Sequence, residues 1–316
     1  MTGMNRTSLG KIAVVGSGAV GCYYGGMLAH AGHDVHFLMR SDLDTVRREG
    51  LVILTKGSEV RLPRVQCAGT TAEIGPADIV IIALKATANR ELERLLPPLI
   101  GERTALFTLQ NGLGNETFLS ERWGEERVMG ALCFVCLNRT APGVIRHIDH
   151  GSISIGEFRR PVSARVRAVA EAFNAVDVEA NVVDDLEGER WRKLLWNIPF
   201  NGLSIAAGAN VAEVLADATL RVEARALMDE LLNAARRLGH DIPDSFADWQ
   251  IERSDSMGPY KPSSMIDYEM GRPVEVEAIW GEPLRQGLAV GVKMPKLEML
   301  HGIIRHMAER CALRGA

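Results

Sequence analysis

One segment of the chain places polar side chains at helical spacing on an otherwise apolar background. Lys193, Asn197 and Asn201 are spaced i, i+4 and i+8, and Ser204 continues the same stripe. A solvated helix face is the simpler alternative, but such faces are usually built from Glu, Lys and Arg, whereas asparagine is a poor helix former. We therefore interpret the stripe as a wall that binds a polar ligand through one ammonium and two amide groups.

A glycine-rich turn near the start of the chain is the second candidate for chemistry. Apolar residues 12–15 lead into Gly16-x-Gly18-x-x-Gly21, and a helix-compatible segment follows. Glycine permits a tight turn at the first position, close approach of backbone to a pyrophosphate at the second, and close helix–strand packing at the third. The helix N-terminus offers N–H groups and a partial positive charge to phosphates. We predict dinucleotide binding by Gly16, Ser17, Gly18, Ala19, Val20 and Gly21.

The end of the second predicted strand, residues 34–39, indicates which dinucleotide binds. In such folds an acidic residue here accepts a hydrogen bond from the ribose 2′-OH of NAD, whereas an arginine accommodates the 2′-phosphate of NADP. Arg40 follows the strand directly, and Asp42 comes two residues later. Asp42 favours NAD instead. A simpler interpretation of Arg40 is a solvated surface charge without a role in binding. We expect NADPH/NADP as the cofactor.

Two further polar residues follow apolar runs that are typical of buried parallel strands. Residues 77–84 lead to Lys85, and residues 104–109 lead to Gln110 and Asn111. Ligands of open α/β sheets lie outside the carboxyl ends of the strands. Lys85 and Asn111 are therefore expected to face the cofactor.

The remaining pattern indicates two domains. Strand-like segments end near residue 185, and the rest reads as helices, including single helices over 187–207 and 211–238. Residues 143–148 and 152–157 resemble antiparallel strands that close the sheet, and residues 51–62 resemble a hairpin. We expect an α/β fold with an N-terminal Rossmann-type doubly wound sheet over residues 1–185 and an all-helical C-terminal domain over residues 186–316.

Composition limits the classes of function. The chain has 316 residues, 47% of them hydrophobic, and a formal net charge of −4. It has no long basic run, so nucleic acid is not an expected partner. No apolar window approaches a membrane span, and the first ten residues lack the apolar core of a signal peptide, so we expect a cytoplasmic protein.

The cysteines and histidines do not predict a metal site. Five scattered cysteines favour reduced thiols over a disulfide framework. Cys133 and Cys136 lack both the helix N-terminus of a redox pair and the four ligands of a zinc site, so we interpret them as buried small hydrophobes. Two pairs of closely spaced histidines lack a third ligand, and no metal is expected.

These motifs together resemble the ketopantoate reductase (2-dehydropantoate 2-reductase) family nearly from end to end. The matching pieces are the glycine loop, Arg40, Lys85, Leu109-Gln-Asn-Gly112, Trp191-x-Lys193-Leu-x-x-Asn197-x-x-x-Asn201, and the segment from Ser263 that ends in Gly-Arg-Pro-x-Glu275. The resemblance implies NADPH-dependent reduction of ketopantoate to pantoate by hydride transfer, with an active site between the two domains.

The resemblance also implies roles for individual residues. Lys193 is the general acid, and Glu275 joins it in the catalytic pair by binding the substrate hydroxyl. The implied substrate-binding residues are Asn111, Asn197, Asn201 and Ser263. Lys85, Asn111 and Glu275 fall among the cofactor-binding residues, beside the glycine loop and Arg40. On pattern alone Glu275 is weaker, because acidic residues at the start of a predicted helix complement its dipole in any case.

Departures from the family pattern leave the substrate open. Ser264 stands where methionine is usual, Ala88 replaces a glutamine found in some members, and Glu277 stands where aspartate is common. One alternative is a paralogue that reduces another 2-keto acid or an imine. A second is a non-catalytic NADP-binding sensor, against which the retained polar residues argue. The expected partner is a small 2-keto acid, and the apolar C-terminal helices are compatible with a homodimer.

Overall fold

The structure, a computed structural model, describes residues 8–314, and the contacts among them divide the chain into two units. The first unit runs to Gln110 and resumes over Asn115–Leu186. The second contains Asn111–Gly114 and the chain from Glu187 onward. The sequence pattern indicated one boundary near residue 185. It did not indicate that the four residues Asn111–Gly114 belong to the helical unit.

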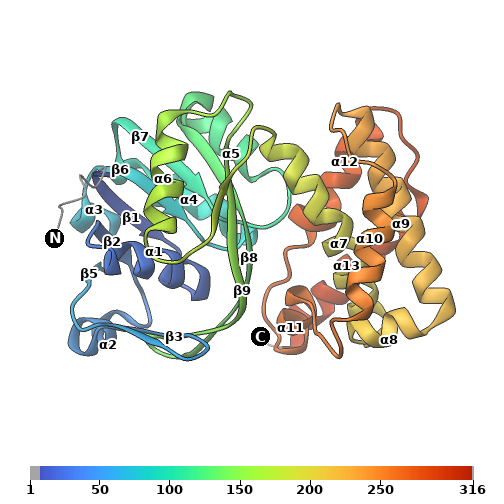
Figure 1. Ribbon diagram of the computed structural model, residues 1–316, viewed down its shortest axis with the longest axis horizontal. Coiled ribbons are helices and arrows are strands. Elements are labelled where there is room, and N and C mark those ends of the chain that lie inside the picture. The colour runs from blue at the N-terminus through green and yellow to red at the C-terminus, as the bar shows by residue number, and fades with distance from the viewer. Residues whose placement is uncertain (1–7, 315–316) are drawn as a thin grey trace. The chain divides into compact units, whose positions relative to one another are not determined.

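Within the described residues, the first unit contains a mixed sheet of ten strands in the order β4-β3-β9-β8-β7-β6-β1-β2-β5, with β10 beside β9. The run β5-β2-β1-β6-β7-β8 is parallel throughout, which is the strand order of a Rossmann sheet. The predicted fold class, with its helical second domain, is confirmed (Figure 1). The strands are β1 (Lys11–Val15), β2 (Asp34–Leu38), β3 (Leu51–Leu54), β4 (Glu59–Leu62), β5 (Gln66–Ala68), β6 (Ala77–Ile82), β7 (Ile100–Thr108), β8 (Val128–Ala141), β9 (Val144–Glu157) and β10 (Ala180–Val182).

Helices cover both faces of this sheet. They are α1 (Ala19–His30), α2 (Leu43–Glu49), α3 (Thr71–Ile74), α4 (Leu92–Leu95), α5 (Asn115–Trp123) and α6 (Ala164–Asn174), with the 3₁₀ turns η1 (Ala86–Glu91), η2 (Pro97–Leu99) and η3 (Glu125–Arg127). Successive strand residues point to opposite faces. Ile12 and Val14 of β1 therefore pack with α1 and α6, whereas Ala13 and Val15 pack with α3, α4 and α5. Burial on both faces explains why the central strands are continuous apolar runs.

The far side of the sheet differs from the prediction. Residues 143–148 and 152–157 are not two strands, because both belong to β9, which pairs antiparallel with β8. His150 has a φ of 58° and Gly151 a φ of 136°, so a bulge interrupts the alternating pattern in the middle of one strand. This pair does not close the sheet either, since β3 pairs with β9 and β4 lies outside it. The predicted hairpin over 51–62 is β3 and β4.

The second unit is helical and has its own apolar core. Its elements are α7 (Leu186–Ala207), α8 (Val211–Ala216), α9 (Ala218–Arg237), α10 (Ser245–Asp255), α11 (Ser263–Glu269), the π-helix η4 (Glu277–Gly281), α12 (Glu282–Ala289) and α13 (Pro295–Arg314). The single helix predicted over 211–238 is wrong, because the chain turns at Asp217. The Asp217 carboxylate accepts hydrogen bonds from the backbone N–H groups of Thr219 and Leu220 and so caps the start of α9. Across residues 8–314, none of the helices combines the length and apolarity needed to cross a membrane.

Candidate active site

The glycine loop lies after β1, which is flanked by β2 and β6, at the point where the strand order reverses. Each glycine has a separate structural reason. A Cβ on Gly16, whose φ is +103°, would lie 2.3 Å from the backbone nitrogen of Leu84. A Cβ on Gly21 would lie 2.2 Å from the carbonyl oxygen of Gly16, whereas one on Gly18 would meet nothing within 4 Å. The first and third glycines therefore serve packing, and the second keeps space open in front of the loop.

The start of α1 is suited to a phosphate. Gly18 is its N-cap, and no side chain caps the helix. Cys22 donates its backbone N–H to the Gly18 carbonyl at 2.9 Å, so the helical ladder begins there and the earlier N–H groups of the first turn remain for a ligand. The open space at Gly18 and these donors together fit a pyrophosphate.

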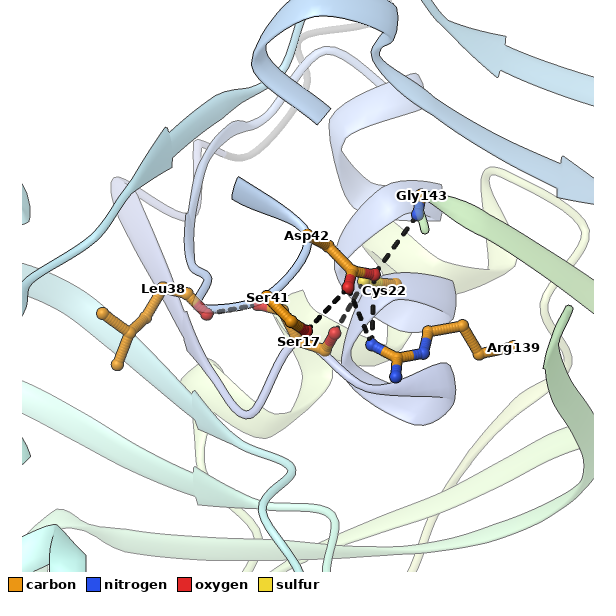
Figure 2. A network of polar contacts seen from close by, with 7 residues as sticks. All are labelled: Ser17, Cys22, Leu38, Ser41, Asp42, Arg139 and Gly143. Carbon is orange, nitrogen blue, oxygen red and sulfur yellow. Dashed lines mark hydrogen bonds and ion pairs between the residues drawn. The ribbon is translucent and has the colours of Figure 1, made fainter. Parts of the chain in front are cut away.

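Arg40 lies two residues beyond the end of β2. The Ser17 hydroxyl donates to the Leu38 carbonyl at 2.7 Å, which joins the glycine loop to this strand end. Arg40 is exposed, and its guanidinium has no hydrogen-bond or ion-pair partner among residues 8–314. Asp42, in contrast, is buried and binds Arg139 at 3.0 Å (Figure 2). Of the two residues that pointed to different cofactors, the arginine is accessible and the acid is paired within the protein.

Lys85 follows β6 on the other side of the switch point and is the N-cap of η1. A polar network that the sequence did not indicate holds η1 in place. Asn89 donates to the Asn115 side chain at 2.9 Å and accepts from Gln110 at 2.7 Å, and Thr108 donates to the Gln110 side-chain oxygen at 3.0 Å. The segment that carries Lys85 is thereby fixed to the end of β7.

The polar stripe lies on α7, as expected from its spacing. At one end the Lys193 ammonium donates to the Asn111 side-chain oxygen at 2.8 Å. Both side chains are partly buried, so this charge-assisted bond is shielded from part of the solvent. Sequence spacing did not predict the contact, because the two residues are 82 positions apart.

The turn that carries Asn111 is fastened to the helical unit by its backbone. Leu113 donates its N–H to the Ala278 carbonyl of the π-helix at 2.9 Å. Gly112 has a φ of +83°, and a Cβ there would lie 2.3 Å from the same carbonyl oxygen. π-Helical turns free backbone groups from the ordinary ladder and recur at functional sites. Here one such carbonyl fixes the position of the Lys193 partner.

The two asparagines of the stripe have different surroundings. Asn201 is 1% exposed, donates to the Asn197 carbonyl at 2.9 Å, and accepts from the Ser264 N–H at 2.8 Å. It therefore caps α11 and holds Ser263, which is exposed at the first helical position, beside the stripe. The Asn197 side-chain amide, in contrast, has no hydrogen-bond partner within the described chain. Asn197 is better placed than Asn201 to bind a ligand.

Glu275 is 9% exposed and lies directly before the helical segment that begins at Val276 and continues as the π-helix from Glu277. Its carbonyl accepts from Ile279 at 3.1 Å. The Trp280 indole donates to the Ile198 carbonyl at 3.0 Å and ties the π-helix to α7. The second unit thus gathers Lys193, Asn111, Asn197, Asn201, Ser263 and the segment after Glu275 around α7, whereas the glycine loop, Arg40 and Lys85 belong to the first unit.

The five cysteines all lie among the described residues and form no disulfide bond. Cys133 and Cys136 are partly rather than fully buried, contrary to the prediction. Both lie on β8 beyond its fully buried first five residues, where successive residues, and therefore both faces of the strand, are partly exposed. Among residues 8–314 no three His, Cys, Asp or Glu side chains cluster as metal ligands would.

The fold and the glycine loop define the class of protein: a Rossmann-type domain of the dinucleotide-binding kind followed by a helical domain. The sequence profile of the ketopantoate reductase PanE/ApbA family matches residues 12–160, and that of its C-terminal domain matches residues 185–308. The chain belongs to the ketopantoate reductase family.

Individual relatives agree with this assignment. A 2-dehydropantoate 2-reductase from Nostoc sp. is 38% identical over 95% of this chain and 96% of that protein. The crystal structure of 2-dehydropantoate 2-reductase from Geobacter metallireducens superposes with a TM-score of 0.91 at 41% identity, covering 94% of this chain and 99% of that one. A D-mandelate dehydrogenase solved with NADH and anilino(oxo)acetate is 21% identical with a TM-score of 0.83, over 95% of this chain and 99% of that one, and shares the fold. Family membership supports a nicotinamide cofactor for this chain.

Proposed function

We propose that this chain reduces 2-dehydropantoate to pantoate with NADPH. The observation that carries the proposal is the Lys193 ammonium held at 2.8 Å by Asn111, on a helix that also presents Asn197, whose side-chain amide has no hydrogen-bond partner among the described residues. The relatives from Nostoc sp. and Geobacter metallireducens are named 2-dehydropantoate 2-reductases, which supports the choice of substrate.

Lys193 is the proposed proton donor. The nicotinamide supplies a hydride to the ketone carbon when it is bound, and the carbonyl oxygen then gains a negative charge and needs a proton. The Lys193 ammonium carries three N–H donors, so one can remain with Asn111 while another is directed to that oxygen. Asn111 keeps the flexible lysine in one orientation, which lowers the entropic cost of reaching the reactive geometry.

Proton transfer from a placed acid typically contributes about 10² to 10⁴ in rate. We therefore expect Lys193→Ala to lower kcat by a factor in that range and to leave the NADPH dissociation constant within about twofold of wild type. Lys261→Ala is the matched control, because Lys261 is an exposed lysine of the same unit that pairs with Glu269. A Lys193→Ala enzyme with near wild-type kcat removes this residue from the mechanism.

NADPH is the proposed cofactor because Arg40 is exposed and available while Asp42 is already paired. A guanidinium is always charged and can form paired hydrogen bonds with a phosphate. Arg40→Ala is expected to weaken NADPH much more than NADH in a fluorescence titration. Equal losses for the two cofactors contradict the assignment.

The substrate is proposed from the groups that the helical unit gathers. Ketopantoate carries a carboxylate, a ketone and a hydroxyl, which suit Ser263, Lys193 and Glu275 respectively. The Glu275 carboxylate is nearly buried, and an ionised carboxylate accepts several hydrogen bonds, so it can accept one from a ligand hydroxyl. Sites built for a hydroxyl reject analogues that lack it by factors of up to roughly 10⁴ to 10⁵.

The test compares kcat/KM for ketopantoate with that for 2-ketoisovalerate, which lacks the hydroxymethyl group. We expect ketopantoate to be preferred by at least about 10², and Glu275→Gln to lose part of that preference. If the unhydroxylated acid is used as well or better, the chain is a family paralogue that reduces another 2-keto acid.

A further inference from the structure

Asp42 is the centre of a polar network that lies beside the loop contacts of Ser17 and Cys22 in the glycine motif (Figure 2). Its Oδ1 accepts from the Arg139 guanidinium at 3.0 Å and from the Ser41 hydroxyl at 2.8 Å. Its Oδ2 accepts from the same guanidinium at 3.1 Å and from the Gly143 N–H at 3.3 Å. Figure 2 shows these groups converging on the carboxylate from the strand end that follows Leu38 and from the long hairpin of β8 and β9.

The position of Arg139 is not dictated by the Rossmann fold. Arg139 lies near the end of β8 and is 97 residues from Asp42. Gly143 lies in the turn between β8 and β9. The long hairpin therefore delivers a cation and a backbone N–H to the segment directly after β2, where cofactor choice is made in dinucleotide-binding folds.

Arg139 changes the charge that Asp42 would present to the adenosine ribose of the cofactor. Arg40 and Asp42 are two positions apart and carry opposite charges. A free carboxylate there would repel a 2′-phosphate and accept a hydrogen bond from the 2′-OH of NADH. With its oxygens already bound, and only 7% of the residue exposed, Asp42 is withdrawn from both interactions.

We propose that Arg139 determines cofactor preference by binding Asp42, so that Arg40 faces the 2′-phosphate without an opposing charge. Arg139 is a positioning residue in this arrangement and acts through the carboxylate. The inference rests on the NADPH dependence proposed above and is independent of which keto acid is the substrate.

The test uses fluorescence titrations of the full-length protein with NADPH and with NADH. Arg139→Met keeps the aliphatic stem and removes the charge, and it is expected to weaken NADPH on the order of tenfold while NADH binds equally or more tightly. Asp42→Asn alone is expected to bind NADPH at least as tightly as wild type. Combined with Arg139→Met, it is expected to restore NADPH affinity to within about threefold of wild type, because the uncompensated charge is gone.

The control is Arg221→Met, which breaks the ion pair of a similarly exposed arginine with Asp255 in the helical unit and is expected to leave the ratio of NADPH to NADH affinity unchanged. Circular dichroism of each variant establishes that it is folded, and Arg139→Lys, which keeps the charge, is expected to retain most of the preference.

Four results overturn the inference. Equal weakening of both cofactors by Arg139→Met means that the ion pair only supports the fold. Weakening of NADPH that Asp42→Asn does not rescue means that Arg139 binds the phosphate itself. A wild-type protein that binds NADH more tightly than NADPH contradicts both the NADPH proposal and this inference. If Arg40→Ala weakens NADPH selectively but Arg139→Met changes neither affinity, only this inference is contradicted.

Discussion

Gly112 offers a sharp perturbation of the candidate site, because its substitution acts on the turn that holds Asn111 without altering any polar side chain. Its φ is +83°, and a Cβ would lie 2.3 Å from the Ala278 oxygen and 2.5 Å from the Ala278 carbonyl carbon. Gly291 is the matched control, since its φ is +80° and a Cβ there would meet nothing within 4 Å. Gly291→Ala carries the conformational cost alone, and Gly112→Ala adds the collision.

The expected magnitudes follow from these two terms. A left-handed conformation costs a residue with a Cβ about 1 to 2 kcal/mol, and overpacking adds about 1 to 3 kcal/mol. If the turn swings away instead, the Leu113–Ala278 hydrogen bond is lost, at about 0.5 to 1.5 kcal/mol. Gly291→Ala should therefore lose about 1 to 2 kcal/mol of unfolding free energy, and Gly112→Ala about 2 to 5 kcal/mol.

The assay combines urea unfolding with steady-state kinetics. Tryptophan fluorescence follows the helical core through the buried Trp191 and Trp280, and kcat is measured well below the unfolding transition. Displacing Asn111 removes its hydrogen bond to Lys193, so Gly112→Ala is expected to lower kcat at least about tenfold, whereas Gly291→Ala keeps it. A Gly112→Ala protein that matches Gly291→Ala in stability and retains wild-type kcat would falsify the account of this turn.

Three further predictions test other parts of the molecule. Gly18→Ala should keep the wild-type unfolding midpoint in urea but bind NADPH more weakly in titration, because its Cβ enters the open space where the pyrophosphate is expected. Gly21→Ala should instead unfold at lower urea, because its Cβ would lie 2.2 Å from the Gly16 carbonyl oxygen. Burial raises the pKa of the Cys22 thiol from 9.0 to about 12, so the thiol's contribution to the free energy of unfolding is complete below pH 9 and is lost as the pH rises toward 12. Between pH 8 and 10, the unfolding free energy of the wild type, measured with urea, should fall by about 1.4 kcal/mol more than that of Cys22→Ala. Equal losses for the two proteins contradict this prediction. Asn201→Ala should cost about 1 kcal/mol or more through the lost cap of α11, whereas Asn197→Ala should raise KM at unchanged stability, and the reverse pattern would exchange their roles.

Much of the fold could be predicted from local patterns. Strands buried on both faces form unbroken apolar runs in the sequence. Gly16-x-Gly18-x-x-Gly21 predicted the first strand, turn and helix, because Gly16 and Gly21 have no room for a Cβ and Gly18 keeps the front of the loop open. Breaks inside elements were harder to predict. The bulge at His150 and Gly151 resembled a loop between two strands in the sequence. Asp217 alone separates α8 from α9, and a one-residue break leaves the helical spacing of apolar residues almost unchanged.

In the candidate site too, features set by local spacing could be predicted, whereas contacts between distant segments could not. Helical spacing placed Lys193 and Asn197 on one face of α7 because the period of a helix is local. The partners that orient the site are distant in sequence, as with Asn111 and Lys193 or Arg139 and Asp42. Such contacts depend on how strands and helices pack, which spacing along the chain does not encode.

The proposed reaction is tested most directly by following the transferred hydrogen. Purified protein is incubated with ketopantoate and NADPH that carries deuterium at both C4 positions of the nicotinamide, and the product is examined by mass spectrometry and NMR. The account predicts pantoate with one deuterium on the carbon that bore the ketone. Absence of pantoate, or pantoate without deuterium at that carbon, would contradict it.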